Sequence, residues 1–159
     1  MEKTSATKKR VQSYISVKRQ HEHKPKEAEK YIEAIGRRKT SVARVRIFTG
    51  EENKKGYSIR VNGKSFDEYF AREKQRQMVC SPFSIAGISY KTSVMARGGG
   101  VNAQAESIRL GIARLLGELH PEHKERFRAL SFLKRDPRMV ERKKFGSRKA
   151  RRPQQWRKR

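Results

Sequence analysis

Apolar residues in this chain are concentrated in its middle, between about Tyr31 and Leu133, and both ends contain few of them. A segment folds on its own only if it buries enough apolar surface to offset the conformational entropy that it loses. The distribution therefore predicts three zones: a flexible N-terminal extension over residues 1–30, a globular α+β domain over 31–133, and an extended basic tail over 134–159. With 34% apolar residues overall, the chain can build about one modest core.

The charge balance indicates the kind of partner. The 159 residues include 41 Lys and Arg but only 16 Asp and Glu, which gives a formal net charge of +25. Nucleic acid neutralises such an excess by exchanging its condensed counterions for Lys and Arg side chains. An anionic membrane surface would require an anchor or a basic amphipathic helix, and we find neither in the sequence. Nucleic acid is therefore the expected partner.

Cysteine usage indicates the compartment. Cys80 is the single cysteine, so an internal disulfide and a cysteine-based zinc site are excluded. We expect a reducing, cytoplasmic location. Organellar import segments are usually poor in acidic residues, and the first 30 residues contain four. These are Glu2, Glu22, Glu27 and Glu29. Location in an organelle is the alternative.

Alternating apolar and polar residues predict the strands. Within residues 41–48, three apolar side chains alternate with Arg44 and Arg46. The same pattern recurs at residues 57–61 and 90–97. Residues 50–56 are rich in Gly, Asn and charge, so they predict a hairpin loop between the first two strands.

The clearest helix is predicted over about residues 102–119, where apolar residues recur at steps of three and four. They are Ala105, Ile108, Ile112, Leu115, Leu116 and Leu119. A short helix is expected from Glu122 to Leu130, and Ser65 is expected to cap another one through Phe70. We expect Ser81-Pro82 to break the chain. Strands and helices built around one sheet predict an α+β domain.

Two basic or glycine-rich segments are candidate phosphate sites. Arg97 and the glycines at 98–100 precede the long helix, where backbone N–H groups attract anions, but a strand-to-helix turn without a ligand is equally consistent with the pattern. The basic run at 36–41 would be only a solvated face in an ordinary protein. In a chain of +25, beside Gly36, which allows close approach, we expect phosphate contact.

The tail is the most basic segment. From Lys134 to Arg159 there are 13 Lys and Arg against Asp136 and Glu141. Its 26 residues reach at most about 85 to 95 Å when extended. A disordered arm that binds any polyanion is the simplest interpretation. However, Trp156 lies among the terminal cations and could stack on a base.

Catalytic constellations are not apparent in the sequence. His120 and His123 flank a proline near a helix boundary without a surrounding set of carboxylates. Cys80 lies in an apolar stretch and is expected to be a packed small residue. A small-molecule kinase remains the rival among enzymes, because the glycines could hold nucleotide phosphates, and a sequence-indifferent RNA-binding chaperone is the other rival.

Several motifs occur in a characteristic order, and together they resemble the universal family of small-subunit ribosomal protein number nine. They are GRRKTSVARV at 36–45, VNGK at 61–64, FDEYF at 66–70, GGG at 98–100, QA at 104–105, IRLGIAR at 108–114, FLKRDPR at 132–138, ERKK at 141–144 and KARR at 149–152. The resemblance covers about residues 31–159. It implies a ribosomal S-five domain-two-like domain, meaning a mixed sheet with packed helices, followed by a long basic tail.

The resemblance also implies a function. Such a protein is a structural constituent of the small ribosomal subunit that binds 16S-type rRNA in the head, beside neighbouring small-subunit proteins, without a cofactor, metal or small-molecule substrate. The rRNA contacts carried over by position are Arg37, Arg38, Lys39, Arg97, Lys143, Lys144, Arg148, Lys149, Arg151 and Arg152. At the end of the tail, Lys158 and Arg159 would contact the anticodon stem-loop of the P-site tRNA.

The sequence departs from the family pattern at both ends. Residues 153–157 place the proline one position early and add a cation, so the approach of the last residues to tRNA can differ in detail. Residues 1–30 have no counterpart in typical members. They are either a lineage-specific extension that contacts rRNA or a neighbouring protein, or part of an import segment.

Overall fold

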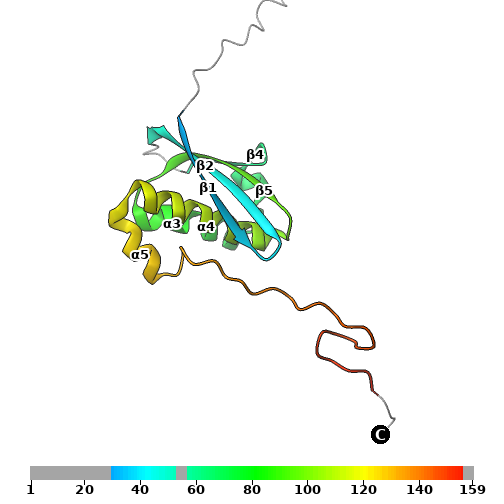
Figure 1. Ribbon diagram of the computed structural model, residues 1–159. Coiled ribbons are helices and arrows are strands. Elements are labelled where there is room, and N and C mark those ends of the chain that lie inside the picture. The colour runs from blue at the N-terminus through cyan, green and yellow to red at the C-terminus, as the bar shows by residue number, and fades with distance from the viewer. Residues whose placement is uncertain (1–29, 53–56, 156–159) are drawn as a thin grey trace, which may run out of the picture.

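A five-stranded mixed sheet with helices packed on one side forms the domain in the computed structural model, which describes residues 30–52 and 57–155 (Figure 1). The strands are β1 (Tyr31–Arg38), β2 (Ser41–Glu52), β3 (Ile59–Val61), β4 (Lys64–Ser65) and β5 (Tyr90–Arg97). The helices are α2 (Phe66–Tyr69), α3 (Glu73–Ala86), α4 (Val101–Leu119), the 3-10 turn η1 (Pro121–His123) and α5 (Lys124–Ala129). The predicted α+β class is confirmed.

The first strand was not expected from the sequence. β1 forms an antiparallel hairpin with β2, in which Arg38 pairs with Ser41 across a two-residue turn. Lys39 takes a positive φ of 50° in this turn. The basic run at 36–41 is therefore the end of a hairpin rather than the entrance to a first strand. Because neighbouring residues of a strand point to opposite faces, Arg37 and Arg38 lie on different sides of the sheet.

The strand order is β1-β2-β5-β3-β4, so the hairpin loop predicted between β2 and β3 was wrong. β2 pairs with β5, and β5 pairs with β3 in parallel. The chain therefore leaves the sheet on one side of β5, at β2, and re-enters it on the other side, at β3; residues 53–56 between them lie outside the described part. The predicted β3–β4 turn at Asn62-Gly63 has positive φ at both residues.

The prediction that Ser81-Pro82 breaks the chain was also wrong, because Pro82 lies inside helix α3. Proline lacks the N–H that would bond the carbonyl of residue 78. The Ser81 hydroxyl donates to that carbonyl at 2.8 Å and replaces the missing bond. The helix ends at Gly87, which has a positive φ of 68°.

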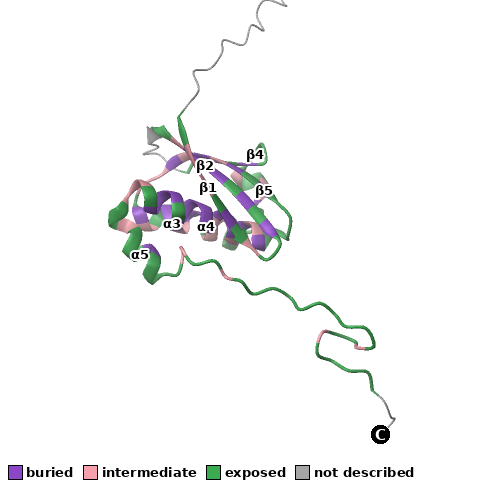
Figure 2. Cartoon of the chain, in the orientation of Figure 1, coloured by how far each residue is buried: buried purple, intermediate pink, exposed green. Residues whose placement is uncertain are grey.

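Helix α4 fills the centre of the core, and its predicted apolar stripe is buried except at Leu119, which is partly buried at the end of the helix (Figure 2). It packs against β1 and β2 so closely that only glycine, which has no Cβ, fits at two of the contact positions. A Cβ on Gly36 would lie 1.8 Å from the Ser107 carbonyl oxygen, and a Cβ on Gly111 would lie 2.6 Å from Val45 Cγ2. The close approach that the sequence suggested for Gly36 is thus to a helix.

The tail leaves the domain after α5 and is exposed along most of its described length (Figure 2). The short helix predicted before it is confirmed as η1 followed by α5. The predicted extension 1–30, apart from Lys30, lies outside the described residues, as do Trp156, Lys158 and Arg159.

Candidate nucleic-acid interface

The sheet brings two of the predicted site residues together although they lie far apart in the sequence. Arg37 of β1 and Arg97 of β5 both align with Val42 of β2, one on each side. All three side chains are exposed on the face of the sheet opposite α4. Among the described residues, neither arginine has an ion pair with a carboxylate. Both are therefore available to an anion.

The next two rows of this open face carry cations that the sequence analysis did not select as site residues. Arg44 lies between Ile35 and Met95, which are 40% and 44% exposed. In the next row, Arg46 of β2 and Arg60 of β3 lie on either side of β5, because both align with Ser93 of that strand. The alternation within residues 41–48 already placed Arg44 and Arg46 on the solvent side, so the signal was present. By itself, however, such alternation indicates only a half-buried strand.

Glu33 is the only carboxylate in these rows of the open face. Its two oxygens pair with Arg44 Nε at 2.8 Å and with Arg46 Nε at 2.7 Å. The hydrogen bond to Glu33 raises the pKa of Arg46. One carboxylate thus holds two guanidinium groups in place and leaves the face with excess positive charge.

Arg38 occupies a different environment from its neighbour. Its side chain is only 12% exposed, and it pairs with Glu106 of α4 and with Asp136 at the start of the tail. It also donates to the main-chain carbonyl of Arg138 at 2.7 Å. The structure therefore gives Arg38 protein partners at each of its three nitrogens.

Lys39 borders a pocket at the N-terminus of α4, with a volume of about 530 Å³. Arg72, Gln75 and Asn102 line the same pocket. The adjoining glycines have a conformational reason to be there: Gly98 and Gly99 have φ of 72° and 63°, and a Cβ on Gly98 would lie 2.6 Å from the Thr40 carbonyl. The glycines can therefore form a turn that requires positive φ and also part of a phosphate site. The same turn places the N-terminus of α4 beside two cations, Lys39 and Arg72.

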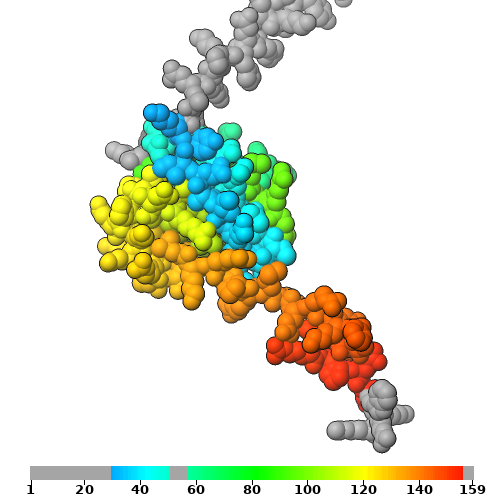
Figure 3. All heavy atoms as spheres, in the orientation of Figure 1, coloured from blue at the N-terminus to red at the C-terminus, as the bar shows by residue number. Residues whose placement is uncertain are grey.

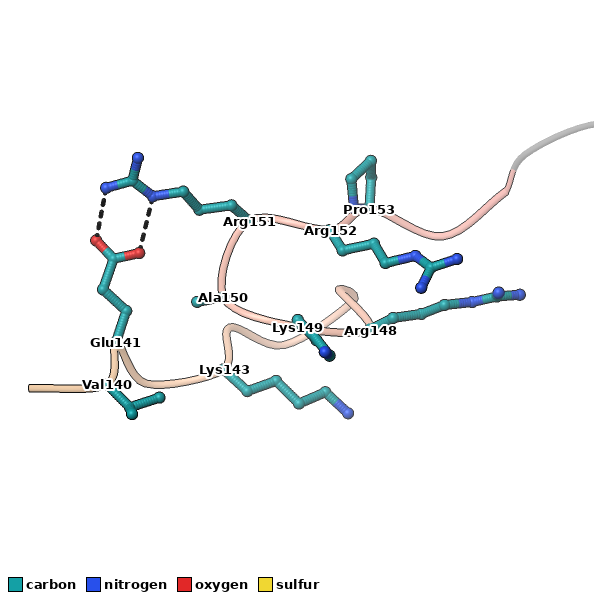
Figure 4. A pocket seen from close by; sticks show the side chains of 9 residues that line it. All are labelled: Val140, Glu141, Lys143, Arg148, Lys149, Ala150, Arg151, Arg152 and Pro153. Atoms are coloured by element: carbon teal, nitrogen blue, oxygen red, sulfur yellow. Dashed lines mark hydrogen bonds and ion pairs between the residues drawn. The ribbon is translucent and has the colours of Figure 1, made fainter. Parts of the chain in front are cut away.

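The tail folds back on itself between residues 141 and 153 and forms what we call the tail hairpin (Figure 4). Arg151 makes two parallel bonds to Glu141, at 2.9 and 3.0 Å. The Arg148 N–H donates to the Arg152 carbonyl at 2.8 Å. The bonds from Arg151 lower the pKa of Glu141, so the pair is ionised at neutral pH.

Cations line the space between the two limbs of the tail hairpin. The pocket there measures about 880 Å³. In Figure 4, the side chains of Lys143, Arg148 and Arg152 extend toward the same side, away from the Glu141–Arg151 pair. Arg151, predicted as an rRNA contact, is thus engaged within the protein, whereas these three point outward.

Two apolar side chains of the tail are exposed among these charges, and the sequence analysis did not select them. Phe145 is 97% exposed and Val140 is 88% exposed. Phe145 precedes Gly146, whose φ of 70° turns the chain. An aromatic ring held in the open beside several cations is suited to stacking on a nucleobase.

The side chains that an enzyme or metal site would use have structural roles or lie apart from one another. Burial raises the pKa of the Cys80 thiol to about 11, which makes it a poor nucleophile. His120 accepts or donates a hydrogen bond with the Tyr90 hydroxyl at 2.8 Å. No cluster of three metal-ligating side chains occurs in the described residues. Within the same residues, no helix is long and apolar enough to cross a membrane.

Comparison with known proteins gives one consistent result. The family model described as "Ribosomal protein S9/S16" matches residues 36–159. The small ribosomal subunit protein uS9 of Cytophaga hutchinsonii is 49% identical over 130 residues, which cover 80% of this chain and 98% of that protein. The uS9 proteins of Anaeromyxobacter sp. (strain K) and Amoebophilus asiaticus are 43% and 42% identical, with 79% and 80% of this chain and 94% and 98% of the relatives covered. The chain therefore belongs to the ribosomal protein S9/S16 family, as the order of its motifs predicted.

Proposed function

We propose that the protein is a structural constituent of the small ribosomal subunit that binds 16S-type rRNA of the head through the open sheet face and the tail hairpin. In this proposal the domain has the S-five domain-two-like fold, and the protein acts in cytoplasmic ribosomes beside other small-subunit proteins. Family membership already makes it a ribosomal protein rather than an enzyme. The observation that carries the rRNA proposal is the tail hairpin, because it holds several cations on one side before any partner is bound.

Each surface offers a different kind of contact. On the sheet, Arg37 and Arg97 flank Val42 and can grip two phosphates across one row. Lys39 adds a cation beside the start of α4, where the helix dipole also attracts phosphate. In the tail hairpin, the outward-pointing cations can contact successive phosphates of the rRNA backbone, and Phe145 can stack on a base. The other predicted contacts there are Lys144, Lys149 and Arg151, and Arg151 also closes the hairpin through its pair with Glu141.

The tail end supplies the second part of the proposal. We place Lys158 and Arg159 at the anticodon stem-loop of the P-site tRNA. They follow the tail hairpin within six residues, so an rRNA-anchored hairpin would limit where they can go. The mechanism is electrostatic: cations stabilise the folded rRNA and hold the tRNA, and no bond is made or broken.

A charge-matched pair of variants tests the rRNA contact. Lys143, Arg148 and Arg152 are changed together to Gln, and the control changes three exposed cations of α5, Lys124, Arg126 and Arg128, in the same way. For binding to the isolated rRNA head domain, the slope of log K against log salt should fall by roughly 2 to 3 in the first variant, since each lost phosphate contact removes about 0.7 to 0.9. An equal fall in the control would show only a general effect of net charge and would refute the hairpin contact.

The general RNA-binding chaperone remains the alternative function. A sequence-indifferent binder leaves the subunit as salt screens its ion pairs, whereas an integrated constituent stays bound. Sedimentation of small subunits through high-salt gradients separates these outcomes. We expect the protein to remain with the subunit, and its complete release would favour the chaperone.

A further inference from the structure

A single arginine of the domain holds the beginning of the tail. We call residues 134–138 the tail root; Figure 3 shows this part of the chain lying along the edge of the domain before the tail leaves it. Arg38 Nη2 lies 3.0 Å from Asp136 Oδ2, and Arg38 Nη1 donates to the Arg138 carbonyl at 2.7 Å. The Nε of Arg38 pairs with Glu106 of α4. Three segments of the chain therefore meet at one guanidinium.

The carboxylate on the tail side is itself fixed from within the tail root. Asp136 accepts the backbone N–H of Arg138 at 2.9 Å and two bonds from the Arg138 guanidinium. These bonds, together with Arg38, lower the pKa of Asp136. The local conformation of residues 136–138 is thus set before Arg38 engages it. Arg38 then joins this rigid turn to β1 and α4.

In the part of the chain that the structure describes, the hydrogen bonds and ion pairs between Arg38 and the tail all lie within the tail root. Between residues 139 and 154, the hydrogen bonds and ion pairs of the described chain join tail residues to one another, as in the Glu141–Arg151 pair. Leu133, just before the tail root, packs against the core. The direction of residues 139–155 therefore depends on the few residues that Arg38 holds.

We propose that Arg38 is a positioning residue, which sets the direction in which the basic tail leaves the domain. Its planar fork suits this task because it can address three partners at once, whereas a lysine offers only one charged atom. The neighbouring Arg37, on the opposite face, remains free for RNA. The inference rests on the proposed function in one respect, that the tail is a segment which must reach an RNA target.

Distances measured in the full-length chain test the orientation directly. Spin labels are placed at Lys74→Cys on α3 and Met139→Cys beyond the tail root, in a Cys80→Ala background, and their separation is measured by pulsed electron resonance. We expect a narrow distance distribution in this parent. Arg38→Gln and Asp136→Asn should each broaden it, because the six residues that follow Leu133, up to Met139, can span up to about 20 Å when released. Arg38→Lys should give an intermediate width.

The matched control is Arg37→Gln, which removes the same charge from the adjacent residue of the same strand. It should leave the distribution narrow. The proposal is overturned if the parent is already broad, if Arg38→Gln stays as narrow as the parent, or if Arg37→Gln broadens it equally. It is also overturned if Arg38→Gln lowers the melting temperature without changing the distribution, because Arg38 would then only stabilise the domain.

Small subunits reconstituted with the same variants separate this inference from the proposed function. We expect Arg38→Gln to weaken P-site tRNA binding more than Arg37→Gln does. If the tail is released in Arg38→Gln but tRNA binds as it does to the parent, the positioning role stands and the proposed tRNA contact is refuted.

Discussion

Gly36 lies where β1 comes closest to helix α4, and this contact tolerates no side chain. A Cβ there would lie 1.8 Å from the Ser107 carbonyl oxygen and 2.8 Å from the Gly111 nitrogen, and both are main-chain atoms that cannot rotate away. We expect Gly36→Ala to lower the free energy of unfolding by about 3 kcal/mol or more, as overpacking does. Gly50→Ala is the control, because nothing lies within 4 Å of its Cβ position. Denaturant unfolding curves measure both, and equal losses would contradict the close packing.

The Glu141–Arg151 pair should make the tail hairpin sensitive to acid. The pKa of Glu141 is lowered in the folded chain, so its contribution is present above its ordinary value of 4.5 and is lost as the pH falls through the lowered value. We expect the hairpin to be closed at neutral pH and to open only in acid below the ordinary range of a glutamate. The NMR shifts of Gly146 and Ala150 report this opening. In Glu141→Gln, the same shifts should already be those of the open form at pH 7.

At the scale of elements, Ser81 is expected to be the reason why helix α3 accepts Pro82. Ser81→Ala should cost about 1 kcal/mol of unfolding free energy, because it leaves the Met78 carbonyl without a donor. In a Pro82→Ala background the backbone N–H of residue 82 can supply that bond, so the same change should cost little. The double-mutant cycle measures the coupling. Equal costs in both backgrounds would mean that the hydroxyl does not compensate for the proline.

How far the elements could be predicted depends on where their signal lies. Helix α4 and strand β5 were predicted because their apolar periodicity is sustained over the whole element. For β2 the alternation ends near residue 48, so the predicted strand is shorter than the observed one, which runs to Glu52. β1 was missed because two of its outward residues, Tyr31 and Ile35, are also apolar, so apolar and polar residues do not alternate clearly along it. α3 was missed because proline is a reliable breaker unless a neighbouring hydroxyl replaces the lost bond.

The candidate site was predictable in the same uneven way. Charge and motif order identified the basic residues, and the family that they indicated is confirmed. Their roles depend on pairing that is invisible in the sequence. Strand register alone joins Arg37 to Arg97, and the packing of α4 together with the path of the tail gives Arg38 its three partners. Phe145 carried no distinguishing signal, because exposure of an aromatic residue is a property of the folded chain.

At the scale of the whole molecule, the tail should be separable from the fold. Deleting Arg157 to Arg159 should leave the melting temperature and subunit assembly largely unchanged, since the buried core lies between Ala43 and Phe127. It should weaken P-site tRNA binding. The effect should be clearest at low magnesium, where few counterions can neutralise the tRNA phosphates in place of the deleted cations. Filter binding of tRNA to reconstituted subunits measures the effect. The control replaces Gln154 with Ala, which keeps the charge, and unchanged affinity in the deletion would refute the contact.

The position of β5 between the two hairpins also determines the order in which the chain can fold during synthesis. The β1–β2 hairpin and the β3–β4 hairpin each consist of neighbours in sequence, but they share no hydrogen bond with one another. Only β5 joins them, and it is made last of the strands. A nascent chain that stops before residue 90 thus holds two separate hairpins whose inner faces are uncovered. The sheet and its helical layer can close only after β5 and α4 have left the exit tunnel, and at that moment the basic tail that follows them is still inside it.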